Sequence, residues 1–340
     1  MNKLKNQNTK KKIIILSIIL VLLIVLTVCV GKYPITIKKS LSILLRAIFL
    51  RPQVEDEMSV SVVLKLRLPR ILVSILVGAA LSISGTCYQG IFKNPLVSPD
   101  FLGVSSGACI GAAVAILIGL SKSYISIFAF IGGILAVIIT SIIPKLINNR
   151  SNIVLVLSGI IVGSLMSSIL GFIKFVADPD TELASITYWT MGSFSYASLQ
   201  DILPIILIII PPTIILILMS WWIDVISMGE DEAKTLGANT KVVKAIVITC
   251  STLLTAGAIC FAGSIGWVGL IVPHISRLLV GSSNQKVIPC SCLLGGIFML
   301  LVDTITRTIG VVEMPVSIMT GIVGAPFFIW LLFKKRNEII

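Results

Sequence analysis

Charged residues and histidine are scarce in this sequence. Asp, Glu, Lys and Arg together make up 12% of the 340 residues, and His274 is the only histidine. One imidazole excludes a metal site built on several histidines. The seven cysteines fall in apolar segments without a Cys-x-x-Cys pair, and the closest two, Cys290 and Cys292, would face different ways on a helix. We therefore expect structural thiols and no bound metal.

Motifs for ATP binding and for catalysis are also missing. Nowhere does Gly-Lys precede Ser or Thr, so the phosphate-binding loop of an ATPase is absent. No Ser/His/Asp arrangement and no pair of catalytic carboxylates stands out, so we predict no catalytic residue and no enzymatic activity. The chain is expected to bind no cofactor itself. If ATP powers its function, another polypeptide must bind and hydrolyse that ATP.

Hydrophobic residues, in contrast, make up 56% of the chain, and its mean hydropathy is +1.07. These values lie outside the range of soluble domains. A membrane-spanning helix needs about 20 apolar residues, and runs of about that length recur along the whole chain. Strands of a membrane barrel would alternate in polarity instead. We predict an all-α, polytopic membrane protein, with one transmembrane domain over residues 1–340.

The apolar runs predict about ten membrane-spanning helices. They cover residues 13–31, 59–84, 101–120, 124–143, 153–176, 202–222, 242–263, 265–280, 287–306 and 316–333. The run at 265–280 is short and contains Gly266, Gly269 and Pro273, which predicts a broken or partial span.

The net charge of +12 would suggest nucleic-acid binding in a soluble protein. In a membrane protein it indicates topology, because Lys and Arg concentrate in cytoplasmic segments, so no nucleic-acid partner is expected and lipid surrounds the chain. Basic residues occur in the tail 1–12 and at the other end of the chain, which predicts two cytoplasmic termini. The acidic segment 178–201 then lies outside. The basic residues of this argument are Lys3, Lys5, Lys10, Lys11, Lys12, Lys145, Arg150, Lys234, Lys241, Lys334, Lys335 and Arg336.

One basic group does not fit this topology. Lys32, Lys38, Lys39, Arg46 and Arg51 lie in the predicted outer loop between the first two spans. The positive-inside pattern would place such a group on the cytoplasmic side. The chain ends carry more weight in our prediction, and the loop stays outside.

A charged island, residues 228–237, interrupts the apolar runs within the predicted cytoplasmic segment 223–240. Three acidic residues follow Gly229, and Gly237 ends the stretch. Acids favour a helix N-terminus and glycine favours the residue after its end, so we predict a short exposed helix. A protein outside the membrane could push on such a helix. A solvated loop between spans is the alternative.

Small residues recur every four positions in the run 153–176, at Gly159, Gly163, Ser167 and Gly171. Such a stripe allows close helix packing in lipid. It also suits a translocation path, where bulky side chains would obstruct the cargo. The spans contain no series of acidic residues of the kind that an ion-coupled carrier uses.

Five segments between residues 60 and 333 resemble, in order and spacing, the permease family of bacterial ABC importers for iron–siderophores, haem and cobalamin. The segments are Arg67-Leu-Pro-Arg70; Tyr88-Gln-Gly-Ile-Phe-Lys-Asn94-Pro95-Leu96-Val-Ser-Pro99 with Leu102-Gly-Val-Ser-Ser-Gly107; Gly229-Glu230…Ala233…Leu236-Gly237; Gly266-Trp-Val-Gly269-Leu-Ile-Val-Pro273-His274-Ile-Ser-Arg277; and Gly321…Gly324-Ala325-Pro326-Phe327-Phe-Ile-Trp330.

The resemblance implies a ten-helix subunit of the bacterial plasma membrane that pairs with a second permease, identical or paralogous, around a central path. Two cytoplasmic ABC ATPase subunits would bind beneath it, and an extracytoplasmic substrate-binding protein would deliver the cargo from above. The implied function is inward transport of an iron–siderophore complex. Haem and cobalamin permeases share the same motifs, so they remain alternatives. An ion-coupled secondary transporter is a further alternative.

The resemblance also assigns roles to particular residues. The acidic island becomes a coupling helix that fits a cleft in the ATPase, with Gly229 and Gly237 at its two ends. Glu230 would add a charged contact, Ala233 would permit close approach, and Leu236 would be an apolar anchor.

Two other sites follow from the same resemblance. Asn94, Pro95 and Leu96 would help to close the cytoplasmic mouth of the path, and Pro95 disfavours helix at Asn94 in any case; a plain turn is the alternative. Arg67, Arg70 and Arg307 would lie at the outer rim, opposite glutamates of the binding protein. The planar guanidinium suits bidentate pairing with a carboxylate. Anchoring in lipid headgroups is the alternative for these arginines.

Overall fold

The computed structural model describes residues 2–149, 151–310 and 312–334. Within these ranges every regular element is helical. The elements are α1 (Asn2–Cys29), α2 (Ile37–Ile48), α3 (Glu57–Ser61), η1 (Val62–Arg67), α4 (Leu68–Phe92), η2 (Pro99–Leu102), α5 (Val104–Leu117), α6 (Lys122–Leu146), α7 (Asn152–Val176), α8 (Glu182–Thr190), α9 (Leu199–Leu218), α10 (Ser220–Met228), α11 (Glu230–Thr235), α12 (Thr240–Ala262), α13 (Val268–Val280), α14 (Asn284–Thr308) and α15 (Val316–Lys334).

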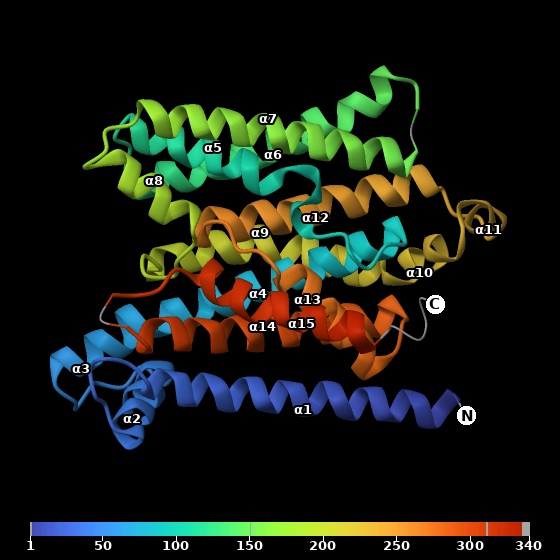
Figure 1. Ribbon diagram of the computed structural model, residues 1–340. Coiled ribbons are helices and arrows are strands. Elements are labelled where there is room, and N and C mark those ends of the chain that lie inside the picture. The colour runs from blue at the N-terminus through green and yellow to red at the C-terminus, as the bar shows by residue number, and fades with distance from the viewer. Residues whose placement is uncertain (1, 150, 311, 335–340) are drawn as a thin grey trace.

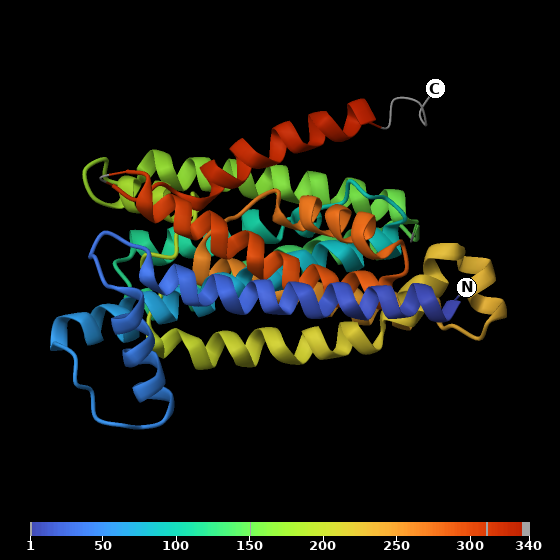
Figure 2. The same cartoon turned by 90° about the horizontal axis from the view of Figure 1, so that it is seen from below.

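The long helices lie roughly side by side and form one elongated bundle (Figures 1 and 2). In the part of the chain that the structure describes, seven helices are long and apolar enough to cross a membrane. Three shorter apolar helices accompany them there, at Val104–Leu117, Val268–Val280 and Val316–Leu331. Each of the ten predicted runs overlaps one of these helices, so the prediction of about ten spans is confirmed. The run 265–280 is one of the short ones, because its helix begins only at Val268.

The helix α4 forms the centre of the bundle. It packs against α9, α12, α13 and α14. In its most apolar stretch, counted from Glu57, 83% of the residues are buried, against 17% in α1 and in α7. Close approach to α14 depends on two facing glycines: a Cβ on Gly78 would lie 2.1 Å from the Gly295 carbonyl oxygen. α1 and α7 therefore leave most of their apolar side chains exposed on the outside of the single chain.

Both ends of the described chain lie at the end of the bundle that carries α11, while α2, α3 and α8 lie at the opposite end (Figure 1). Lys10, Lys11 and Lys12 are therefore at the α11 end, as the topology argument requires. Arg150, Lys335 and Arg336 lie outside the described residues. The segment 32–56 is not only a loop, because it contains α2. The side chain of Thr36, the residue before α2, caps this helix by accepting a hydrogen bond from the Lys39 N–H.

Candidate functional site

The acidic island forms a short helix, α11, at one end of the bundle (Figure 1). Its first turn carries Glu230, Asp231 and Glu232, where carboxylates favour the helix dipole. Gly237 follows the helix with φ +82°, a left-handed conformation that favours glycine. Gly229 has an extended backbone instead, so its φ angle does not require glycine. The predicted helix is confirmed, and it covers residues 230–235.

Ala233 of this helix and Leu236, which directly follows it, differ in burial. Ala233 is completely buried and belongs to the main hydrophobic core of the chain, together with the nearby Ala238. Leu236 is 54% exposed. The expectation that Ala233 permits close approach of a partner is wrong for its side chain, because that methyl group faces the bundle. Glu230, Asp231, Glu232, Lys234 and Leu236 form the exposed face of α11.

Two sets of polar contacts fasten this region to the spans. Lys244 of α12 forms an ion pair with Glu230 and donates a 3.0 Å hydrogen bond to Asn152, the first residue of α7. Asp224 of α10 accepts hydrogen bonds from the backbone N–H and the side-chain amide of Asn284, at 2.6 and 2.8 Å. Asp224 thus caps the first turn of α14. The sequence analysis missed Asp224, whose signal is a carboxylate alone in an apolar stretch.

A further ion pair, Asp231–Lys234, lies within α11 itself. Lys234 donates a 2.8 Å hydrogen bond to Asp231, three residues away, and both side chains are exposed. The bonded ammonium lowers the pKa of the Asp231 carboxyl, and the carboxylate raises the pKa of Lys234. Exposed pairs of this kind contribute little to stability. The tip is therefore a charged surface that remains available to a partner.

The turn after α4 holds the predicted gate residues. Lys93 has a left-handed backbone that ends the helix, and the side chain of Asn94 accepts a 2.9 Å hydrogen bond from the Leu96 N–H. Leu96 is 65% exposed. A groove of about 170 Å³ runs beside this turn and reaches α10, so the turn lies at the same end as α11. Its lining residues are Gln89, Gly90, Lys93, Asn94, Pro95, Ser227, Arg277, Ser282 and Asn284.

Gln89 connects the gate turn to the short span α13. Its side-chain amide donates to the carbonyl oxygens of Val97 and Gly269, at 3.3 Å each, and its oxygen accepts a hydrogen bond from Arg277. Gln89 and Arg277 belong to two of the quoted motifs, but the sequence analysis did not propose a role for either. Their contact explains why two motifs far apart in the chain occur together.

A second pair of motifs meets where α13 begins. Trp267 has a φ of +71°, which is strained for a bulky residue. Its ring packs on Gly324 of α15, where a Cβ would lie 2.6 Å from the indole carbons. The span 265–280 is thus shortened by an unwound start that a glycine on a neighbouring helix accommodates.

The stripe of small residues on α7 divides into two parts. Gly159 is buried, and a Cβ there would lie 2.3 Å from the carbonyl oxygen of Phe101, so this glycine serves packing. Gly163 is half-buried with open space beyond its Cα, and Ser167 and Gly171 are exposed. The exposed part of the stripe also carries Ser164 and Ser168. This face of α7 is small and hydroxyl-rich at that end of the helix.

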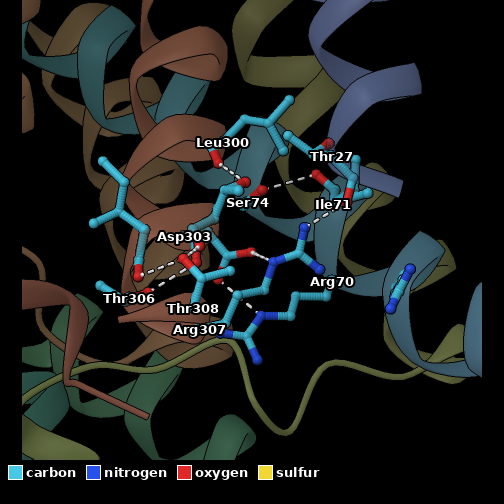
Figure 3. A network of polar contacts seen from close by, with 12 residues as sticks. Thr27, Arg70, Ile71, Ser74, Leu300, Asp303, Thr306, Arg307 and Thr308 are labelled. Atoms are coloured by element: carbon cyan, nitrogen blue, oxygen red, sulfur yellow. Dashed lines mark hydrogen bonds and ion pairs between the residues drawn. The ribbon is translucent and has the colours of Figure 1, made fainter. Parts of the chain in front are cut away.

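Arg67, Arg70 and Arg307 lie near the end of the bundle opposite α11, but they do not face solvent. Their relative exposures are 5%, 8% and 6%. Arg70 donates to Asp303 at 2.8 Å and holds both carboxylate oxygens of Glu313, at 2.9 and 2.7 Å. Arg307 lies 4.0 Å from the second Asp303 oxygen, and Figure 3 shows the two guanidinium groups around that carboxylate.

The other contacts of these arginines involve the end of α1. Arg67 donates to the carbonyl oxygens of Val28 and Cys29, at 2.7 and 3.2 Å, and Arg307 donates to that of Thr27 at 2.6 Å. These are carbonyl groups of the last helical turn, which has no intrahelical donors for them. The three arginines thus lie at the predicted end of the chain, but helix ends and buried carboxylates already engage their guanidinium groups. Their role in docking stays a prediction without a test.

Glu313 joins three elements at this end. Besides Arg70, it accepts a hydrogen bond from Ser195, and Tyr188 of α8 donates to its backbone oxygen at 2.9 Å. Partial burial raises the pKa of the Glu313 carboxyl, but the bonds from Ser195 and Arg70 outweigh it and lower the pKa below its ordinary value. In residues 2–149, 151–310 and 312–334, no three His, Cys, Asp or Glu side chains converge as a metal site would require.

The comparison with known proteins supplies the family. The sequence profile of the FecCD transport family matches residues 19–334. This chain belongs to the FecCD transport family. It is therefore a multi-pass membrane permease, and the resemblance drawn from the five segments is confirmed.

The relatives of this chain differ in the cargo that their names give. A molybdate import permease of Haemophilus influenzae is 36% identical over 95% of each chain. A probable iron chelatin permease of Helicobacter pylori is 39% identical, over 81% of this chain and 83% of its own. A hemin permease of Yersinia pestis is 34% identical, over 81% of this chain and 84% of its own. A solved inward-facing structure, assigned to the metal-chelate type of ABC transporter, matches 96% of this chain and 99% of its own, with a TM-score of 0.86 and 35% identity.

Proposed function

We propose that this permease carries an iron–siderophore complex inward as part of a binding-protein-dependent ABC importer. In this proposal two copies of the chain, or this chain and a paralogue, surround the path. Two ATPase subunits bind at the α11 end, which is cytoplasmic, and supply the energy of ATP hydrolysis. A substrate-binding protein docks at the α8 end.

The observation that carries the ATPase contact is the construction of α11. Its exposed residues are charged apart from Thr235 and Leu236, while Ala233 anchors it in the core. The Lys244 contacts connect it to α7 and α12, and Asp224 connects the preceding helix to α14. A push on α11 is therefore transmitted to three spans through direct contacts.

The path in this proposal runs along the exposed half of the α7 stripe and ends at the gate turn. Gly163 and Ser167 present small groups along it, and the exposed Leu96 would meet its counterpart from the second permease at the cytoplasmic mouth. Cysteine at position 96 in both subunits should cross-link in one nucleotide state and not in the other. Cross-linking that ignores the nucleotide state, or its absence in every state, would count against a gate.

The cargo is inferred from the relatives and from the lining of the path. Iron chelatin and hemin permeases are among the relatives, and the exposed α7 face offers hydroxyl groups and glycines. A bulky chelate needs such small, neutral lining more than it needs fixed cations. Molybdate is the second candidate, because the molybdate permease matches 95% of this chain at 36% identity.

Uptake into proteoliposomes tests both levels of this proposal. The permease is reconstituted with its ATPase and binding protein, and radiolabelled ferric siderophores, haem, cobalamin and molybdate are offered separately. ATP-dependent accumulation of a ferric siderophore supports the proposal, whereas preferential accumulation of molybdate, haem or cobalamin overturns the cargo assignment. Uptake that survives ATP depletion but collapses with an ionophore would favour an ion-coupled carrier instead.

A further inference from the structure

The helix α2 has an unusual surface for the outside of a protein. Four of its apolar residues recur at helical spacing on the outward side: Ile37, Leu41, Leu45 and Ile48. All four are exposed, with Ile48 71% and Ile37 59% accessible, and Phe49 and Leu50 follow directly with 66% and 93%. An exposed stripe of this size marks a contact with something apolar.

The position of α2 in the bundle indicates what that contact is. Its inner residue Ile43 is buried in a cluster with Val28 at the end of α1 and Val63 of η1. The apolar run of α1 begins after Lys10, Lys11 and Lys12, and residues 13–29 make about 26 Å of helix, close to the roughly 30 Å of bilayer hydrocarbon. Val28 therefore marks the depth where hydrocarbon ends, and Figure 2 shows α2 running across the axis of α1 there.

The polar side of α2 is basic. Segment 32–65 contains Lys32, Lys38, Lys39, Arg46, Arg51 and Lys65 against Glu55, Asp56 and Glu57. Asp56 is engaged by Lys39, and its side chain also caps α3. The excess of positive charge therefore falls on the flank of the apolar stripe. A helix with one apolar side and one basic side is typical of binding in the interface of an anionic membrane.

A pocket of about 320 Å³ lies where these two sides of α2 meet, lined by Ser42, Leu45, Arg46, Phe49 and Arg51. Its polar groups are two guanidiniums and one hydroxyl, without a carboxylate. Arg46 donates one N–H to the Pro52 carbonyl oxygen at 2.9 Å, and the Arg51 N–H donates to the Arg46 carbonyl oxygen at 2.8 Å. The second of these is a backbone bond, and together they shape the turn that brings both arginines to the lining of this pocket. Such a pocket fits an anionic headgroup whose tail continues over Leu45 and Phe49.

We propose that α2 lies in the membrane interface and that Arg46 and Arg51 bind the phosphate of an anionic phospholipid. The apolar stripe then lies among acyl chains, continuous with the exposed apolar side chains of α1. This site explains the basic group that the positive-inside pattern leaves unexplained. The inference needs only the membrane location of the chain, and the proposed function enters only in naming the leaflet as the outer one. A docking site for the substrate-binding protein is the rival use of this surface.

The depth of α2 is measured with a nitroxide on Ile48→Cys in nanodiscs that contain phosphatidylglycerol and phosphatidylcholine. Labelling of the unsubstituted protein gives the background of native cysteines. The position-48 label should be accessible to oxygen and protected from a water-soluble nickel chelate, while a label on Thr235→Cys in α11 should show the reverse. A label at position 48 that the nickel chelate reaches overturns the proposal. So does protection that appears only when the purified binding protein is added.

The headgroup site is tested with the Arg46→Gln/Arg51→Gln double variant. Each basic residue near an anionic surface changes lipid affinity about fivefold. The double variant should therefore bind phosphatidylglycerol, titrated into detergent and followed by native mass spectrometry, at least about tenfold more weakly. The matched control is Lys145→Gln/Lys241→Gln, which removes two cations at the α11 end and should leave this binding event intact.

An equal loss of phosphatidylglycerol affinity in the two double variants would overturn the site. It would show that affinity depends on the net charge of the protein and not on these two arginines. A second titration uses inorganic phosphate against the parent protein. Phosphate at millimolar concentration should leave phosphatidylglycerol bound, because the acyl chains supply part of the affinity. Complete displacement by free phosphate would show a simple anion site and would overturn the assignment to a lipid.

Discussion

The two ends of the bundle use charge in opposite ways. At the α11 end the pair Asp231–Lys234 has side chains that are 92% and 60% exposed. At the other end Asp303 is fully buried, and the side chain of its partner Arg70 is 10% exposed. Exposed pairs are worth little to stability, whereas breaking a buried pair leaves an uncompensated charge. The first end therefore offers its charges to a partner, and the second uses them to hold helices together.

The largest effect is expected from Asp303→Leu. This change leaves Arg70 and Arg307 in the interior without their shared carboxylate, and the loss of one partner of a buried pair costs about 3–5 kcal/mol. The melting temperature of the purified protein in nanodiscs should fall clearly. Asp180→Leu, which removes an exposed carboxylate near the same end, is the matched control and should leave the melting temperature unchanged. Equal melting temperatures of the two variants would contradict the idea that buried charges at this end hold the helices together.

A smaller loss of stability is expected from Ala233→Trp in the helix α11. The indole cannot fit in the buried position of a methyl group, and overpacking of this kind costs about 1–3 kcal/mol. The helix should be displaced, so that transport-coupled ATP hydrolysis is lost while the protein remains inserted.

The exposed neighbour Leu236→Ser separates packing from docking in the same assay. This variant should keep the melting temperature of the parent and still lower coupled ATP hydrolysis, because the side chain faces away from the bundle. If Leu236→Ser hydrolyses ATP like the parent in the assembled transporter, α11 does not use this residue as its anchor.

A pH-dependent effect is expected at Glu313. Its pKa in the folded chain lies below the ordinary 4.5, so the carboxylate stabilises the fold above pH 4.5, and this contribution is lost as the pH falls through the lower folded value. Melting temperatures between pH 6 and pH 3.5 should therefore decline more steeply in the parent than in Glu313→Gln. Parallel curves for the two proteins would show that the contacts to Arg70 and Ser195 carry no net stabilisation.

The smallest effect is expected from Asp231→Asn. The side chain is exposed and its partner Lys234 remains solvated, so neither the melting temperature nor its salt dependence should change measurably. The binding rate of the ATPase subunit at low salt is the sensitive measurement, because exposed charges act mainly on association. A change in stability as large as that of Asp303→Leu would contradict the comparison.

The spans could be predicted because lipid imposes one requirement, a run of apolar residues long enough to cross it. The acidic helix could be predicted from Gly229 and Gly237 around three acids. The burial of the Ala233 side chain could not be predicted, because a helix of six residues has too few positions to show which side is buried. For Arg67, Arg70 and Arg307 the sequence shows only that they lie at span ends. At a span end, an arginine that will be buried cannot be told from an exposed one by its neighbours in the sequence. The partner of a buried arginine can also be far away in the chain, as Asp303 is from Arg70.

The helix α2 was missed for a related reason. A search for long apolar runs passes over a 12-residue helix whose apolar residues are spaced three or four apart. Its basic residues were noticed only as an exception to the topology. Asp224 was also overlooked, because its partner Asn284 lies 60 residues away and no local pattern connects the two.

The hydrogen bonds from Arg67 and Arg307 to the end of α1 also set an order of assembly. The helix α1 is synthesised first, and its last carbonyl groups, at Thr27, Val28 and Cys29, reach the bilayer surface with their partners still missing. Arg67 arrives after about 40 further residues and Arg307 only after 280. The end of α1 thus gains its last hydrogen bond late in synthesis, and a nascent chain truncated before α14 supplies only the bonds from Arg67 to Val28 and Cys29.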